Sequence, residues 1–146
     1  MADLRNTRFS IYLRNQLLDA LGLAAFNSCK ILIYSGVQPV TPETAIGAQV
    51  LLDTITGNAV CFPAPPAAAN GVATANATTA GVAVAAGTAA WFRVTNSAGT
   101  QVLCDGSVGP SGGPDTYNLA LSSVAVTVGL SLNASSFTLT LPMQGL

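Results

Sequence analysis

Short apolar runs separated by Gly, Pro, Ser and Asn fill the chain from residue 30 to its end, and this pattern constrains the fold most. Runs of this length that are rich in β-branched and aromatic side chains are typical of β-strands bounded by turns. About eight or nine such runs at regular spacing indicate a mainly β protein, an antiparallel β-sandwich or a jelly-roll-like fold. The expected strands are 30–36, 50–56, 59–62, 72–78, 90–95, 100–105, 117–121, 124–128 and 137–141.

Two longer stretches between these strands are expected to be connections. Residues 37–48 contain two prolines and a glycine, which predicts an extended excursion between two strands. Residues 106–114 are rich in Gly, Pro and Ser, which predicts a loop.

The clearest local signal is a β-hairpin. Two alternating runs, 90–95 and 100–105, flank the turn residues 96–99, whose sequence is Asn-Ser-Ala-Gly. Trp91, the sole tryptophan, lies in the first run and is expected in the core rather than on the surface as a sugar-stacking platform. Arg93 follows on the same strand face, so we expect it to be half exposed, over the indole ring.

Before residue 30 the apolar period changes from that of a strand to that of a helix. Ser10 is a candidate N-cap and Gly22 a candidate C-cap, so a short N-terminal α-helix is predicted over 10–22. This helix either lies on the body of its own subunit or docks on a partner. Its apolar stripe consists of Leu13, Leu17, Leu18 and Leu21.

The charge is distributed unevenly along a chain that we expect to be one domain. The first thirty residues carry four basic and two acidic side chains, hence +2, and the rest carry one basic and four acidic side chains, hence −3. We therefore expect a helical or docking segment over 1–29 and a β-sandwich body over 30–146. In the segment, arginines would pair with carboxylates of a partner and aromatic rings would supply apolar contact. The candidate partner-contact residues are Arg5, Arg8, Phe9, Tyr12 and Arg14.

The composition points to a covered surface. Only 8% of the residues are charged and the net charge is −1, whereas an average globular protein has about 25% charged residues. We therefore expect copies of the chain, most simply a two-fold dimer, or another protein to cover much of the surface. A chain that is not basic is not expected to bind nucleic acid. The chain has no uninterrupted apolar stretch of about 18 residues, so no membrane-spanning helix is predicted. No signal peptide is expected either.

Catalytic chemistry is not expected. The chain has no histidine, so the commonest general base and metal ligand is missing. The letters around Ser111 match the G-x-S-x-G nucleophile elbow, but Pro114 and a strand follow where an elbow needs a helix. Asp105 and Asp115 flank this loop and could bind Ca²⁺ or act in acid–base chemistry, although Asp at a turn boundary is the ordinary finding. We expect no enzyme activity, no cofactor and no metal.

The three cysteines are expected to be free. Cys29, Cys61 and Cys104 are odd in number, widely spaced and without a C-x-x-C motif. Each lies in or beside an apolar run, which predicts buried thiols in a reducing compartment.

Six segments, in order along nearly the whole chain, carry a resemblance to a known family. They are 13–21, 33–39, 71–77, 87–94, 105–109 and 136–142. These segments resemble a family of small structural proteins of tailed bacteriophages, some of which look like capsid decoration (cement) proteins. The resemblance implies a virion protein and no catalytic residues. The chain departs from the family at Cys104-Asp105, where an aromatic or aliphatic residue would precede Asp.

The resemblance and the composition together predict a capsid decoration protein that binds and stabilises the shell of the major capsid protein. Such a protein is made in the host cytoplasm and lies on the capsid surface of the virion. One alternative is a tail, baseplate or head-to-tail adaptor component, which would be present in far fewer copies. A second alternative is a carbohydrate-binding module of a host-recognition fibre, which needs an exposed row of aromatic side chains.

Overall fold

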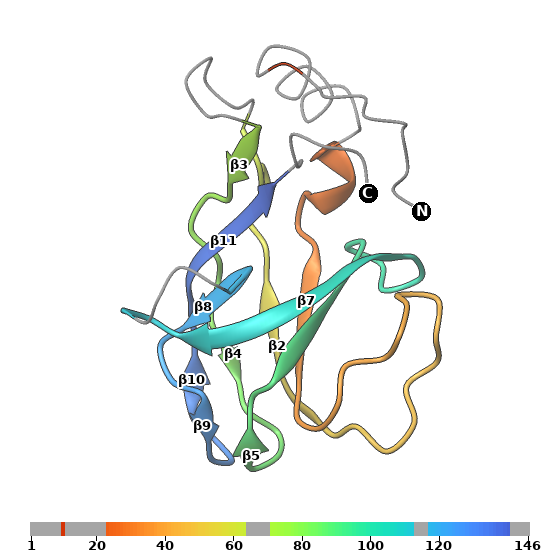
Figure 1. Cartoon of the computed structure of the whole chain (residues 1–146). Helices are drawn as coiled ribbons and strands as arrows, with labels where there is room; N and C mark the ends of the chain where they lie inside the picture. Colours follow the sequence, from red (N-terminus) through yellow and green to blue (C-terminus); the bar gives the residue numbers. More distant parts are fainter. Residues whose placement is uncertain (1–9, 11–22, 64–70, 113–116, 141–146) are drawn as a thin grey trace.

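The computed structural model describes residues 10, 23–63, 71–112 and 117–140 of the chain. This part of the chain is mainly β, as predicted (Figure 1). Apart from Ser10, which is exposed and not helical, the predicted helix over 10–22 lies outside the described residues. The helical element that the structure does describe is a short 3₁₀ turn, η1, Leu23–Phe26.

Seven of the strands form one mixed sheet in the order β2-β1-β6-β7-β8-β11-β3. Two further pairs, β10-β4 and β5-β9, stand beside it. The expectation of a wholly antiparallel body is wrong at one place, because β7 and β8 pair in parallel, with Val108 opposite Leu119. The strands are β1 Lys30–Tyr34, β2 Leu51–Thr56, β3 Val72–Thr74, β4 Gly81–Val82, β5 Gly87–Thr88, β6 Trp91–Thr95, β7 Val102–Pro110, β8 Leu119–Leu121, β9 Ala125–Val126, β10 Ser131–Leu132 and β11 Ala134–Thr140.

Backbone hydrogen bonds link the two edges of the seven-stranded sheet. At one edge β3 pairs with β11, and the chain that follows β3 reaches β2 at the other edge. Thr56 and Thr79 exchange backbone hydrogen bonds of 3.1 and 2.8 Å, and the Val84 N–H donates to the Leu52 carbonyl at 2.8 Å. The hydrogen bonding therefore continues around the body. In Figure 1, β7 crosses in front of β2.

The core follows from the alternation of side chains along the strands. In β1 the side chains of Ile31 and Ile33 are fully buried. Four phenylalanines form a chain of edge-to-face contacts through this core, with ring centroids 5.0 to 5.5 Å apart. This geometry is favoured for aromatic pairs and adds to the apolar burial. In order of contact the rings are Phe26, Phe62, Phe137 and Phe92.

The predicted hairpin is confirmed by the antiparallel pairing of β6 and β7. The predicted loop over 106–114 is wrong in its first half, because β7 continues to Pro110. Glycine is needed inside this strand, since a Cβ at Gly106 would lie 2.6 Å from the ring of Phe92. A glycine in a strand often marks such a close approach.

Two other strand predictions need correction. Residues 59–62 form a turn rather than a strand, although Cys61 and Phe62 are buried there. The predicted strand over 72–78 ends at Thr74. Its expected alanine face is present at Ala73, which is fully buried, whereas Ala77 is exposed.

Gly81 allows β4 to lie against β2. A Cβ at this position would collide with the carboxylate of Asp53, whose Cγ would be 2.7 Å away, and with the backbone carbonyl of Thr54. Because one of these obstacles is backbone, the collision cannot be relieved by rotating a side chain.

We predict that Gly81→Ala separates β4 from β2 and lowers the free energy of unfolding by about 3 kcal/mol. Urea unfolding followed by tryptophan fluorescence measures the change. Gly47→Ala is the matched control, because a Cβ at Gly47 makes only an ordinary contact of 3.7 Å with Gln49. Equal effects of the two substitutions would contradict the role assigned to Gly81.

Candidate functional site

The five partner-contact residues expected from the sequence lie outside the described residues. They are Arg5, Arg8, Phe9, Tyr12 and Arg14. The site that the structure does describe is the connection between β1 and β2, residues 35–50, here called the β1–β2 loop. It corresponds to the excursion predicted over 37–48.

The β1–β2 loop carries two strongly exposed valines. The side chains of Val37 and Val40 are 82% and 96% exposed. Pro39 and Pro42 lie beside them and restrict the backbone. The loop therefore presents apolar side chains to solvent on a stiff backbone.

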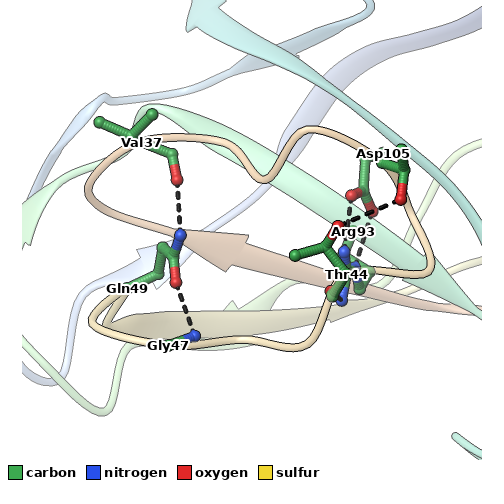
Figure 2. Close-up of polar contacts among 7 residues, drawn as sticks. Val37, Thr44, Gly47, Gln49, Arg93 and Asp105 are labelled. Atoms are coloured by element: carbon green, nitrogen blue, oxygen red, sulfur yellow. Dashed lines mark hydrogen bonds and ion pairs between the residues drawn. The ribbon is translucent and has the colours of Figure 1, made fainter.

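The base of the loop is held by hydrogen bonds through Gln49 (Figure 2). Its side-chain amide donates to the Val37 carbonyl at 2.7 Å and accepts from the Gly47 N–H at 2.8 Å. The Ser35 N–H also donates to the Val50 carbonyl at 3.0 Å, where the loop meets the two strands. Gln49 thus joins both limbs of the loop.

An ion pair beneath the loop holds its other half. Arg93 on β6 and Asp105 on β7 face each other, and the guanidinium donates Nε and Nη2 hydrogen bonds of 2.8 and 2.7 Å to the two carboxylate oxygens. Nη1 of Arg93 donates to the Thr44 carbonyl at 3.0 Å (Figure 2). One guanidinium therefore connects the hairpin to the loop.

The guanidinium also lies on an aromatic stack. The Cζ atom of Arg93 is 5.6 Å from the centroid of the Trp91 ring. The Tyr34 ring stacks on the Trp91 ring, with 4.7 Å between the two ring centroids. The prediction that Arg93 lies over the indole is confirmed, and so is the burial of Trp91. The prediction that Arg93 is half exposed is wrong: it is 5% exposed, because the β1–β2 loop covers this face of β6.

The electrostatics of this cluster follow from its burial. The hydrogen bonds to Asp105 raise the pKa of Arg93, so the guanidinium keeps its charge. Burial raises the pKa of Tyr34, so the phenol stays neutral. A buried ion pair adds little net stability, but it fixes geometry, because either partner alone would be an uncompensated buried charge.

Neither of the weaker chemical interpretations gains support from the geometry. Both carboxylate oxygens of Asp105 accept hydrogen bonds from Arg93, and Asp115 lies outside the described residues. Ser111 lies in a turn after β7, and its N–H donates to the Leu121 carbonyl at 2.9 Å. Within 23–63, 71–112 and 117–140, no three His, Cys, Asp or Glu side chains gather as a metal site.

The side chain of Asp53 on β2 is a second buried carboxyl group that the sequence did not suggest. It is 1% exposed, and its Oδ1 accepts a hydrogen bond of 2.6 Å from the Thr54 N–H. Its Oδ2 has no hydrogen-bond partner among the described residues. Burial raises the pKa of this carboxyl, while the Thr54 hydrogen bond opposes that shift.

Comparisons of the chain with models of protein families, with curated proteins and with solved structures find no match. Among the described residues, no helix has the length and apolar character needed to span a bilayer. The functional argument therefore rests on the residues of this chain.

We predict that Asp105→Asn destabilises the protein by about 3–5 kcal/mol, because it leaves Arg93 buried without a counter-charge. The double variant Arg93→Met/Asp105→Leu should lose much less than the sum of its single substitutions, since neither charge remains. Urea unfolding of the wild type, Arg93→Met, Asp105→Leu and the double variant measures the coupling. Additive losses would show that the two side chains do not act as a pair.

We predict that Asp53→Asn changes how stability depends on pH. The folded protein raises the pKa of Asp53, so its stabilising contribution is full below the unfolded value of about 3.9 and is lost as pH rises through the folded value. The free energy of unfolding of the variant, minus that of the wild type, should therefore rise with pH above 4 and then level off. A difference that stays flat in urea titrations across this range would contradict a raised pKa.

Proposed function

We propose that this protein is a non-enzymatic structural protein of a virion, most simply a decoration protein that binds and stabilises the shell of the major capsid protein. The carrying observation is the β1–β2 loop, which exposes two valines and whose backbone is held by Gln49 at its base and by the buried ion pair at Thr44. We further infer a sandwich or jelly-roll body over 30–146 with a short helix over 10–22.

An ordered loop of this kind suits attachment to another protein. Binding orders fewer degrees of freedom when the contact surface is already fixed, so more of the apolar burial appears as affinity. The low charge of the chain supports the same view, because charged residues are depleted at the centre of interfaces. A cement role needs contact area and stiffness and no catalytic group.

The carbohydrate-binding alternative finds less support. A sugar platform needs exposed aromatic rings, but Trp91 and Tyr34 are buried in the stack beneath the β1–β2 loop. Within the described residues Tyr117 is the large aromatic side chain that is exposed. The tail, baseplate and adaptor alternatives differ from decoration in copy number rather than in surface chemistry.

The proposal includes a second contact from the N-terminal segment. Arg5, Arg8 and Arg14 would pair with carboxylates of the major capsid protein, and Phe9 and Tyr12 would add apolar contact. Each exposed ion pair contributes only about 0–1 kcal/mol, so many copies acting together and self-association, most simply as a dimer, would supply the rest. The protein would be made in the host cytoplasm and end on the capsid surface.

We predict that Val37→Ser/Val40→Ser weakens attachment to capsid shells by about tenfold or more, since burial of a valine contributes about 1.5 kcal/mol or more. The assay is cosedimentation with shells stripped of this chain, from the phage that encodes it. Val128→Ser is the matched control, because Val128 is an exposed valine outside the β1–β2 loop.

Two further measurements separate the proposed contacts and positions. A chain lacking residues 1–22 should lose attachment while its body stays folded, as judged by urea unfolding. A reconstruction of the virion should show the chain in hundreds of copies on the shell. Density for only six to twelve copies at the neck or tail would overturn decoration in favour of an adaptor or tail component, and no density would overturn the virion assignment.

A further inference from the structure

Two buried thiols face each other where β1 begins. Cys29 precedes β1 and Cys61 lies in the turn after β2, and both side chains are 0% exposed. Their Sγ atoms are 4.0 Å apart, a contact in which either thiol can donate a hydrogen bond. The thiols are free in this structure, and the predicted burial is confirmed for both, while Cys104 is half-buried.

The backbone holds the two segments that carry these thiols in register. The Gly57 N–H donates to the Cys29 carbonyl at 2.8 Å, and the Ser28 N–H donates to the Asn58 carbonyl at 2.8 Å. The Cys61 N–H donates to the side-chain oxygen of Asn27 at 3.1 Å. Three separate hydrogen bonds therefore hold the two segments together and keep the two sulfurs close to each other.

A glycine provides the space that the sulfurs occupy. A Cβ at Gly57 would lie 2.6 Å from the sulfur of Cys29 and 3.3 Å from that of Cys61. With hydrogen alone at Gly57, the sulfurs meet beside its backbone. Any larger residue would force at least one sulfur away.

We propose that Cys29 and Cys61 are a site of reversible oxidation, at which a low-molecular-weight disulfide converts the two thiols into an intramolecular disulfide. A disulfide needs an S–S distance of about 2.05 Å, so the sulfurs must approach by about 2 Å. Rotation about the Cα–Cβ bonds moves sulfur on this scale while the hydrogen-bonded backbone stays in place.

The reaction is a thiol–disulfide exchange in two steps. The Cys61 thiol loses its proton and its sulfur attacks the small disulfide, which releases one small thiol and leaves a mixed disulfide. The Cys29 thiol loses its proton and attacks the Cys61 sulfur, which releases the second small thiol. The two protein thiols together lose two electrons and two protons, and the small disulfide takes up both.

The contact between the thiols favours this order. When Cys29 donates the hydrogen bond, it lowers the pKa of Cys61 and raises that of Cys29, which makes Cys61 the readier thiolate. Cys61 also lies next to Val60, whose side chain is exposed, so a small local opening of the turn brings it to solvent. By contrast, burial and Asp105 raise the pKa of Cys104 to about 12, which keeps this half-buried thiol protonated and unreactive at neutral pH.

The experiment treats the full reduced chain with 2-hydroxyethyl disulfide at neutral pH, blocks the remaining thiols in denaturant and maps the peptides by mass spectrometry. We expect a Cys29–Cys61 link, the loss of two hydrogens and Cys104 recovered in blocked form. The link closes a long segment of chain, so the melting temperature should rise by about 5–10 °C, and dithiothreitol should reverse the rise.

Variants separate this pair from the third cysteine. Cys104→Ala should keep both the link and the rise in melting temperature, and Cys61→Ala should lose both. The proposal is overturned if the folded wild-type chain keeps Cys29 and Cys61 blockable after prolonged treatment, or if either of them links to Cys104 or to a second chain. Because the mapping uses the wild-type protein, a variant that fails to fold does not decide the outcome.

Discussion

The position of the β1–β2 loop over the β6–β7 hairpin depends on the ion pair between Arg93 and Asp105. The guanidinium uses Nε and Nη2 for the carboxylate and Nη1 for the Thr44 carbonyl, so one side chain fixes the hairpin and the loop together. In a chain with only eleven charged residues, the burial of two of them at one place is an unusual use of charge. It is tolerated because each partner satisfies the other and because Trp91 supports the guanidinium from one side. The result is a loop whose position is determined from inside the protein.

The strands could be predicted where alternation and turn residues agreed. The hairpin formed by β6 and β7 and the start of β1 are examples. The buried side chains recur at every second position only at the start of β1, whereas all five residues of β6 are buried. The prediction failed where glycine acts inside a strand. In β7, Gly106 makes room for the ring of Phe92, and a sequence without coordinates cannot distinguish such a glycine from a turn residue. The strand prediction failed again at residues 59–62. The apolar side chains there are buried although the segment is a turn and does not pair with a strand.

The candidate site was harder to predict because it depends on register. Residues 96–99 were identified as the turn, but a β-bulge between Val94 and Thr95 shifts the pairing by one residue. Without the bulge, Arg93 would stand opposite Cys104; with it, Arg93 stands opposite Asp105. A one-residue shift of this kind changes which side chains share a face, and nothing in the residue types of the hairpin required it. The excursion was predicted, but not that it folds back over Arg93.

The two constraints on the β1–β2 loop are independent of each other. Arg93 acts on the middle of the loop through Thr44, whereas the thiols of Cys29 and Cys61 stand at the two ends of the segment that contains the loop and both of its strands. A covalent bond between the thiols would limit how far β1 and β2 can separate, but it would leave the guanidinium contact unchanged. Loss of the ion pair would release the middle of the loop at Thr44, while Gln49 still joins its two limbs and β1 and β2 stay paired. The interactions that hold the exposed valines can therefore be removed one at a time. The effect of loop order on binding can then be measured separately from the effect of strand pairing.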